Sequence, residues 1–265
     1  MALQIKNAKF LRYGRGRLGP FARQLAIAVI GPKRRWNDLQ DEEVSHWEYS
    51  FATKGSSWPE HYRFCLDPGS PLQKYVADYL PERSPVNILD VGSGPLVILG
   101  KRWKHELRIV AADPNANEYA RLYAKYGVTP LCRPIPAYAE ELTAHFPLNH
   151  FHLVHARNCL DHSRDPIKGM SEILAVLKPG CWALLLHVVN EGQRQDYVGP
   201  HQWNFFARRG EFWVRRPGRP PLSVTEKLGH LAEVHVEQPI SPEIRAENWE
   251  DRDCWIMVRM RKRPC

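Results

Sequence analysis

No apolar run in this 265-residue chain approaches the roughly 18 residues that a membrane-spanning helix needs. The longest run near the N-terminus, LAIAVI at residues 25–30, is far shorter, and no small-residue cleavage pattern follows it, so we expect no secretory signal. The six cysteines are scattered without a C-x-x-C pair, which argues against a zinc site. These absences favour a cytoplasmic protein with reduced, buried thiols and no bound metal.

Acidic side chains are missing from residues 1–36, which carry nine Lys or Arg and much of the formal net charge of +8. One interpretation is an arm that makes peripheral contact with an anionic membrane surface, or that binds nucleic acid or an acidic substrate. The other is a solvated arm whose short helix packs on the domain. The sequence is compatible with both.

Residues 36–67 are rich in aromatic side chains and also hold Gly, Ser and Pro, so we expect few long regular elements there. Aromatic side chains at this density either cover a site or pack on a face of the main domain. We therefore treat residues 1–69 as a basic and aromatic-rich N-terminal extension, and residues 70–265 as the main domain.

The main domain shows an alternation of apolar runs and amphipathic segments. It predicts an α/β fold, a doubly wound and mostly parallel sheet, with an antiparallel hairpin at one edge and an irregular segment at residues 190–221. The predicted strands are 86–91, 107–113, 128–132, 151–158, 181–189, 232–238 and 253–261. The predicted helices are 70–81, 96–106, 115–127, 137–146, 164–180 and 223–231.

A third glycine is missing from the turn after the first predicted strand, which reads Gly92-Ser93-Gly94-Pro95-Leu96. A dinucleotide site requires G-x-G-x-x-G, so this absence argues against an NAD-dependent oxidoreductase. Two glycines still let a ligand approach the backbone closely. Asp113 ends the next strand, where a carboxylate accepts hydrogen bonds from ribose hydroxyls. The pattern indicates an adenosine site without a pyrophosphate.

The stretch ILDVGSGP, followed by IVAADP, resembles the class I S-adenosylmethionine (SAM)-dependent methyltransferases. AYAEEL, FHLVHARNCLDH and EILAVLKPGCWALLLH continue the resemblance in family order over about residues 70–190. It implies a seven-stranded sheet with an antiparallel last strand, SAM as cofactor and S-adenosylhomocysteine as product. Pro95 and Leu96 depart from the small residues common there. The residues that the resemblance places around the cofactor are Asp90, Gly92, Ser93, Gly94, Asp113, Pro114, Ala139, Glu140, Arg157 and Asn158.

The acceptor site of this family is formed by loops after the fourth and fifth strands and by the N-terminal extension. His201 is our candidate general base, because imidazole titrates near neutral pH, and Asp161 and His162 are further candidate catalytic residues. The structural alternative is that Asp161 caps a turn and the histidines pack on neighbours. Other candidates are Asn190, Glu191 and Trp203 for substrate contact, and Arg63 for the carboxylate of SAM.

The resulting expectation is methyl transfer to an oxygen, or less readily a nitrogen, of a small molecule or saccharide. Nucleic acid is disfavoured, because RNCLDH stands where nucleobase methyltransferases carry a [DN]PP[YFW]-like motif. The alternative is a non-catalytic SAM-binding or scaffold protein that the basic arm attaches to a membrane or to a biosynthetic complex. The acceptor's identity and the oligomeric state are not specified by the sequence.

Overall fold

The computed structural model describes residues 32–56, 58–197, 199–237 and 255–264, and its side chains from residue 40 onward. The chain divides into two compact units, Met1–Asp38 and Leu39–Cys265. The predicted basic arm lies mostly outside the described residues. Within the described part, every helix is too short or too polar to cross a bilayer. The fold below is that of Leu39–Cys265.

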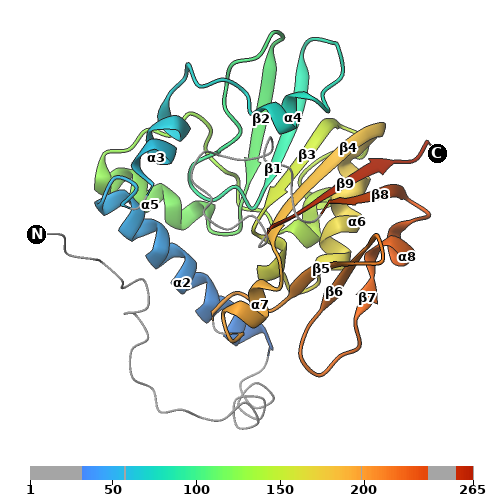
Figure 1. Cartoon of the computed structure of the whole chain (residues 1–265). Helices are drawn as coiled ribbons and strands as arrows, with labels where there is room; N and C mark the ends of the chain where they lie inside the picture. The colour runs from blue at the N-terminus through green and yellow to red at the C-terminus, as the bar shows by residue number, and fades with distance from the viewer. Residues whose placement is uncertain (1–31, 57, 198, 238–254, 265) are drawn as a thin grey trace, which may run out of the picture. The chain divides into compact units, whose positions relative to one another are not determined.

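A six-stranded mixed sheet forms the centre of the fold, in the order β2-β1-β3-β4-β9-β8 (Figure 1). The first four of these pair in parallel, whereas β9 runs antiparallel to both β4 and β8. This confirms an α/β fold with a mostly parallel sheet and an antiparallel hairpin at its edge. Strand order reverses between β1 and β3, which is where such sheets bind ligands. The strands are β1 (Val86–Val91), β2 (Leu107–Ala112), β3 (Phe151–Arg157), β4 (Leu177–Val188), β8 (Ala232–Glu237) and β9 (Trp255–Lys262).

The strand predicted at residues 128–132 does not form among the described residues, which accounts for six strands in place of seven. This part of the chain reaches the sheet only at an isolated bridge between Ala112 and Ile135. Pro130, Pro134 and Pro136 surround that bridge. Proline lacks the N–H that a strand must donate, so pairing cannot extend.

Two helices confirm their sequence signals. In α5 (Ala116–Tyr126) the helix ends at Gly127, whose φ of 63° is left-handed. In α6 (Pro166–Val176) the carboxylate of Asp165 accepts hydrogen bonds from the N–H groups of Ile167 and Lys168. The end of α5 and the start of α6 therefore agree with the sequence prediction. The predicted end of the second helix at residue 180 is wrong, because α6 stops at Val176 and residues 177–180 already belong to β4 (Leu177–Val188).

The helix predicted at residues 96–106 is absent, and the one predicted at 70–81 is reduced to α4 (Lys74–Ala77). The two segments pair with each other instead. The N–H of Leu72 donates to the carbonyl of Arg102, and the N–H of Gln73 donates to that of Leu99. Because these backbone groups are used between the segments, neither segment can build a long helix from its own backbone.

The segment predicted as irregular, residues 190–221, forms regular structure. It contains α7 (Glu191–Arg194), β5 (Asn204–Arg208) and β6 (Glu211–Arg215). β7 (Leu222–Ser223), directly after the segment, completes a small antiparallel sheet in the order β5-β6-β7, and α8 (Val224–Leu228) follows. Arg209 and Gly210 join β5 to β6, both at positive φ, as a two-residue hairpin turn requires. An Arg-Gly pair is a weaker turn signal than Asn-Gly, which is why the sequence pattern missed the hairpin.

Two helices precede the sheet, α2 (Pro32–Ala52) and α3 (Pro59–Leu66), so the expectation of few long elements here is wrong. The breaking residues begin only at Gly55, and the stretch before it contains no Gly or Pro after residue 32. Phe51 of α2 and Cys65 of α3 pack with Tyr119 and Tyr123 of α5. The aromatic segment therefore packs on the main domain.

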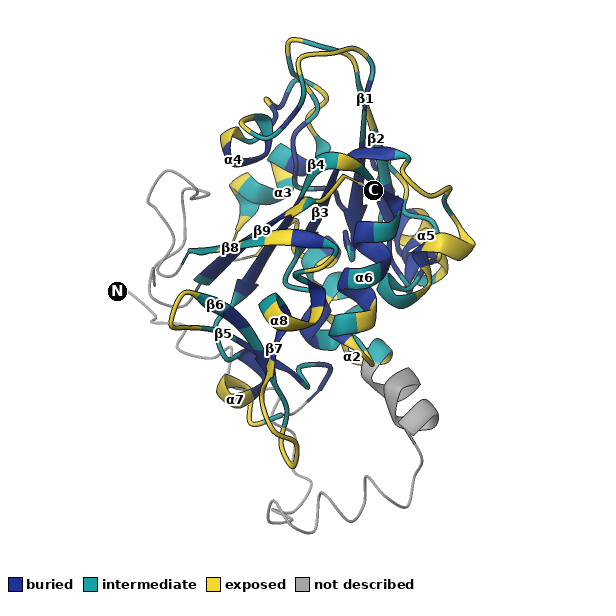
Figure 2. Ribbon diagram, turned by 90° about the vertical axis from the view of Figure 1, so that its right-hand side faces the viewer, coloured by how far each residue is buried: buried dark blue, intermediate teal, exposed yellow. Residues whose placement is uncertain are grey.

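The strands of the central sheet are largely buried, as their dark colour in Figure 2 shows, and each face of the sheet carries its own buried cluster. Ile88, Leu153 and Leu184 face a cluster completed by α4 and by Val97 and Leu99. Their neighbours Leu89, Val154 and Leu185 face the opposite cluster, which α6, α8 and the small sheet complete. This arrangement leaves the carboxyl ends of β1, β2 and β3 to carry the polar residues described next.

Candidate functional site

The turn after β1 is shaped by two left-handed glycines, Gly92 (φ 60°) and Gly94 (φ 61°). A Cβ on Gly92 would lie 2.3 Å from the Cβ of Cys159, and one on Gly94 would lie 2.7 Å from Cζ2 of Trp47. Neither position has room for a side chain, and both favour glycine conformationally. The absence of a side chain at both glycines therefore lets Cys159 and Trp47 pack directly against the backbone of this turn.

Asp113 lies beside this turn at the end of β2. Its Oδ2 accepts a hydrogen bond from the N–H of Gly94 and its Oδ1 accepts one from the N–H of Asn115, both at 2.9 Å. Burial raises the pKa of Asp113 to about 7, although these two bonds oppose the shift. A carboxylate has about four acceptor positions, so both oxygens can still accept from ribose hydroxyls. The turn and this carboxylate fit the adenosine part of SAM.

Asp90 has an internal partner. Its Oδ1 lies 2.7 Å from Nδ1 of His155, and Nε2 of His155 lies 3.0 Å from the hydroxyl of Tyr75. All three side chains are buried. These two hydrogen bonds fix the carboxylate of Asp90 near the end of β1, directly before the glycine turn.

The other residues that the resemblance places around the cofactor divide into two groups. Ser93 lies in the turn, where its hydroxyl donates to the carbonyl of Gly94, and Pro114 follows Asp113. Ala139 and Glu140 lie in η1 (Ala139–Ala144), and Oε1 of Glu140 accepts from the N–H groups ahead of α6. Glu140 therefore has a structural partner in this conformation.

Two further predicted residues lie at the end of β3. The guanidinium of Arg157 lies 5.4 Å from the ring of Trp255, and burial lowers its pKa. Asn158 has a left-handed φ of 48°, and its Oδ1 accepts from the N–H of Val188 at 3.4 Å. Arg63, by contrast, is exposed and pairs with Glu60 on α3, so the structure does not bring it together with the others.

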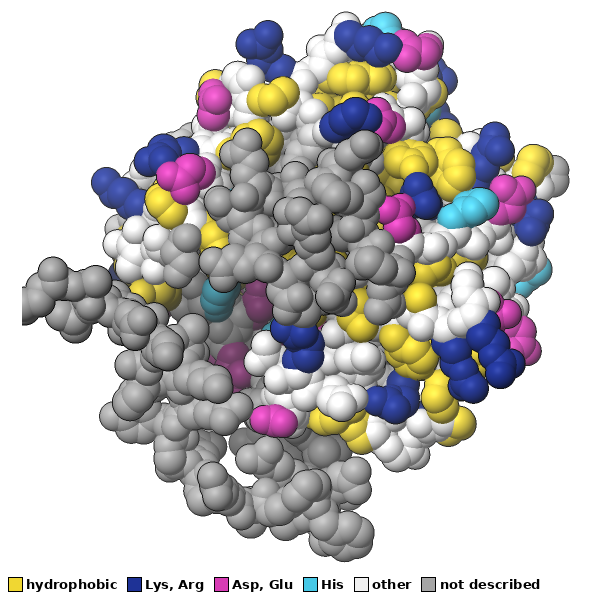
Figure 3. All heavy atoms as spheres, in the orientation of Figure 1, with side chains coloured by type: hydrophobic (Ala, Val, Ile, Leu, Met, Phe, Trp, Pro, Cys, Tyr) yellow, Lys and Arg dark blue, Asp and Glu magenta, His cyan; other side chains and the backbone are white. Residues whose placement is uncertain are grey.

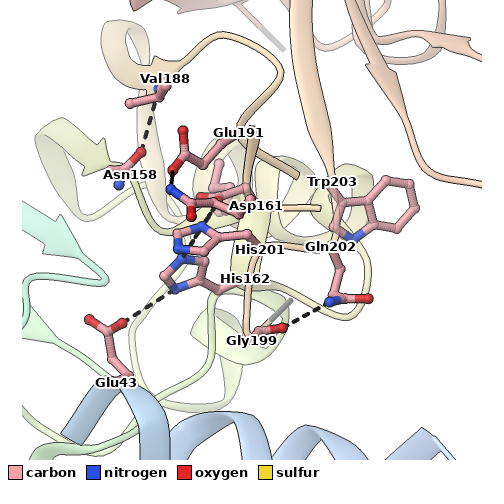
Figure 4. Close-up of polar contacts among 12 residues, drawn as sticks. Glu43, Asn158, Asp161, His162, Val188, Glu191, Gly199, His201, Gln202 and Trp203 are labelled. Carbon is pink, nitrogen blue, oxygen red and sulfur yellow. Dashed lines mark hydrogen bonds and ion pairs between the residues drawn. The ribbon is translucent and has the colours of Figure 1, made fainter. Parts of the chain in front are cut away.

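The predicted catalytic residues do lie together (Figure 4). Asp161 and His162 belong to η2 (Leu160–His162), directly after β3, and His201 lies in the loop between α7 and β5. Nδ1 of His201 lies 2.8 Å from Oδ2 of Asp161. Nε2 of His162 lies 3.1 Å from Nδ1 of His201 and 3.4 Å from the same carboxylate oxygen. Two segments far apart in sequence thus form one polar cluster.

In this cluster, Asp161 and the histidines each favour the charged form of the other. Burial alone would raise the pKa of Asp161, but the neighbouring His162 and the hydrogen bond from His201 lower it to about 2. Burial would lower the pKa of His201, but Asp161, with contributions from Glu191 and Glu43, raises it above its usual value. Asp161 is therefore ionised at neutral pH and holds the imidazole of His201 by Nδ1.

The same cluster offers a set of metal ligands. Asp161, His162 and His201 each present one ligand atom, all within 4.8 Å of one another, and two histidines with one carboxylate suit a divalent cation. Oδ1 of Asp161 is buried without a hydrogen-bond partner among the described residues. The geometry therefore admits either acid–base chemistry or cation binding at one place.

Backbone contacts hold the loop of His201 in place. The N–H of Gln202 donates to the carbonyl of Asp161, and Nε1 of Trp203 donates to the carbonyl of Ser163. Trp203 is buried, so its indole attaches the loop to η2. Asn190 begins α7 with a left-handed φ, and the buried Glu191 accepts from Gln195. Among the predicted substrate-contact residues, Glu191 lies close enough to His201 to raise its pKa.

Four residues border this site without being among the predicted site residues, and two of them, Gln40 and Glu43, were missed by sequence reasoning altogether. Gln40, Glu43 and Trp47 project from one side of α2, at positions i, i+3 and i+7, toward the turn and the cluster. His187 is fully buried at the end of β4, and burial lowers its pKa to about 4. The helical spacing on α2 was the available signal, but the expected irregularity of residues 36–67 concealed it.

Comparison with known proteins identifies the family. Residues 60–217, more than half of the chain, match a family model described as a methyltransferase domain. A search of curated proteins found no match. Similar solved structures include a methyltransferase of Haloferax volcanii in complex with the Trm112 activator (15% identity, 84% of this chain and 98% of that chain, TM-score 0.49).

Two further similar structures are a SAM-dependent methyltransferase of Listeria monocytogenes (14% identity, 72% and 97%, TM-score 0.44) and a 1,6-didemethyltoxoflavin-N1-methyltransferase. The latter, from Burkholderia thailandensis, contains S-adenosylhomocysteine (14% identity, 88% and 92%, TM-score 0.45). The family model carries the assignment, and the glycine turn with Asp113 agrees with it. The chain belongs to the methyltransferase-domain family and is a SAM-dependent methyltransferase.

Proposed function

We propose that the protein transfers a methyl group from SAM to a hydroxyl oxygen of a small molecule or saccharide, with His201 as general base. The observation that carries this proposal is the 2.8 Å contact between Nδ1 of His201 and the buried carboxylate of Asp161. A carboxylate at Nδ1 fixes the tautomer and leaves Nε2 as the basic nitrogen. No described residue hydrogen-bonds to Nε2, so that nitrogen is available to an acceptor.

The proton and the methyl group move in one balanced step. SAM supplies an electrophilic methyl group. As the acceptor oxygen would form its bond to that carbon, the carbon–sulfur bond would break and leave its electron pair on the sulfur of S-adenosylhomocysteine. Nε2 of His201 takes the hydroxyl proton, and Nδ1–H stays hydrogen-bonded to Asp161. The imidazolium that forms is stabilised by the ionised Asp161 next to it. Asp161 is a positioning residue in this scheme, and His162 supports the same carboxylate.

An oxygen acceptor is favoured over nitrogen because a neutral amine attacks without prior loss of a proton, whereas a hydroxyl benefits from a base. A nucleic-acid acceptor is disfavoured by the residues that follow β3 and by the charge distribution. In the face shown in Figure 3, Lys and Arg side chains are interspersed with Asp and Glu among the coloured residues. A nucleic-acid site would require basic side chains gathered along one groove.

The test is methylation of a panel of hydroxylated small molecules and sugars with isotopically labelled SAM, followed by mass spectrometry and NMR of the product. We expect a labelled O-methyl product, and a loss of kcat of about 10²–10⁴-fold in His201→Gln. His230→Gln, which changes an exposed histidine, is the matched control. A product methylated on nitrogen or carbon, or full activity in His201→Gln, would refute the proposal. Cofactor binding without turnover on any acceptor would favour the scaffold alternative.

A further inference from the structure

Glu43 of α2 lies between the cofactor turn and the proposed acceptor cluster. Its Oε1 accepts a hydrogen bond from Nε1 of Trp47 at 2.8 Å, and its Oε2 lies 3.9 Å from Nδ1 of His162. Figure 4 shows the carboxylate of Glu43 directed from α2 toward His162. One side chain thus contacts both a residue of the cofactor side and a residue of the acceptor side.

The neighbours of Glu43 on α2 fix the helix against the cofactor turn. The indole of Trp47 fills the space over Gly94, and Oε1 of Gln40 accepts from Nδ2 of Asn115 at 2.9 Å. Asn115 in turn donates its N–H to Asp113. Gln40 and Trp47 therefore attach this face of α2 to Asn115 and to Gly94, and Glu43 lies between them along the helix.

The negative charge of Glu43 acts on both the cofactor side and the acceptor side. Glu43 adds to the effect of burial in raising the pKa of Asp113, and it is among the charges that raise that of His201. Its side chain is 26% exposed, so water screens the charge only partly. Among the described residues, its one ion pair is the long contact with His162. A cationic ligand next to Glu43 would give this carboxylate a closer positive partner than His162.

The two ligands of the reaction differ in charge at the reacting atom. SAM carries a positive sulfonium, whereas S-adenosylhomocysteine has a neutral thioether in its place. In-line transfer requires the sulfur to lie between the adenosine site and the acceptor. Asp113 marks the adenosine site and the His201 cluster marks the proposed acceptor site. The charged sulfur of SAM would then lie between them, next to Glu43.

We propose that Glu43 is a cofactor-binding residue whose carboxylate recognises the positive charge of SAM and so favours the substrate over the demethylated product. The location of the acceptor side rests on the proposed function, but the recognition of charge does not depend on which acceptor is used. A purely structural role, in which Glu43 only anchors Trp47, would affect both ligands alike because both share the adenosine and methionine parts.

The test is isothermal titration calorimetry of SAM, of S-adenosylhomocysteine and of an analogue with a protonated amine in place of the sulfonium. The variants are Glu43→Gln and Glu43→Ala, the latter because alanine is the best residue for a helix. Asp41→Asn is the matched control, since it removes the same charge from an exposed position on the same helix. Thermal melting shows whether each variant is folded.

We expect both Glu43 variants to bind SAM and the amine analogue about tenfold more weakly, with a change of less than about twofold for S-adenosylhomocysteine. Equal weakening of all three ligands, or no change in any, would overturn the proposal. The same selective loss in Asp41→Asn would also overturn it, because the effect would then reflect net charge alone. Since no acceptor is present, a failure here leaves the role of His201 untouched, and an inactive acceptor panel leaves this measurement valid.

Discussion

His201 hydrogen-bonds to Asp161 across 40 residues of sequence, and the backbone next to each holds the pair in register. The N–H of Gln202 donates to the carbonyl of Asp161 itself, so the loop cannot slide along η2 without losing two contacts at once. The imidazole is therefore oriented before any ligand binds. Preorganisation of this kind removes the cost of orienting the base during the reaction.

If His201 is the base, as proposed, the pH dependence of the reaction follows from this contact. His201 accepts a proton only when it is neutral, and Asp161 is the main charge that raises its pKa above the usual 6.5, against burial. Glu191 and Glu43 act in the same direction. We therefore expect kcat/KM of the wild type to fall as the pH decreases through a value above 6.5. In Asp161→Asn this acid limb should move to lower pH, and the plateau should fall. A limb at the same pH in both proteins would contradict the role of Asp161.

Treatment with a chelator distinguishes acid–base chemistry from metal binding at Asp161, His162 and His201. If His201 acts as a base, protein dialysed against EDTA and shown to be metal-free by mass spectrometry should keep its full rate. Loss of activity that Mg²⁺, Mn²⁺ or Zn²⁺ restores would instead assign Asp161, His162 and His201 as metal ligands. The same dialysis of Asp161→Asn provides the comparison, since it removes one ligand atom.

Cofactor affinity should depend on the ionisation of Asp113. Burial raises its pKa to about 7, and the ionised carboxylate is the better acceptor for ribose hydroxyls. The affinity for SAM, measured by calorimetry, should therefore weaken as the pH decreases through about 7. Asp113→Ala should bind SAM at least about tenfold more weakly, with little change across the same range. A wild-type affinity independent of pH would show that the protonated carboxyl serves equally well.

The glycine turn can be tested by separating strain from crowding. Gly92 and Gly127 have nearly the same φ, 60° and 63°, but a Cβ on Gly127 meets nothing within 4 Å. Gly127→Ala should therefore cost about 1 kcal/mol of stability from backbone strain alone. Gly92→Ala should cost about 2–3 kcal/mol more, because its Cβ would collide with Cys159. Urea denaturation measures both, and equal losses would show that Cys159 moves aside freely.

The parts of the fold that the sequence predicted are those encoded by local chemistry. Asp165 and Pro166 begin a helix because a carboxylate caps free N–H groups and proline suits the first turn, and Gly127 ends one because it adopts a left-handed φ. The buried strands β1, β3 and β4 follow from apolar runs bounded by turn residues. The helix predicted at 96–106 does not form because its backbone pairs with residues 72 and 73. The strand predicted at 128–132 does not form because of the prolines in and next to it.

The sequence by itself determined the α/β class, the glycine turn and the residue types needed for a methyltransferase, since each depends on neighbours a few positions away. It also singled out Asp161, His162 and His201 as candidates, but not their distances. Only the tertiary structure shows that η2 and the loop before β5 lie together and that Arg63 is exposed. It also shows that Glu43 of α2 lies beside His162. These outcomes depend on packing between segments remote in sequence, which no local pattern encodes.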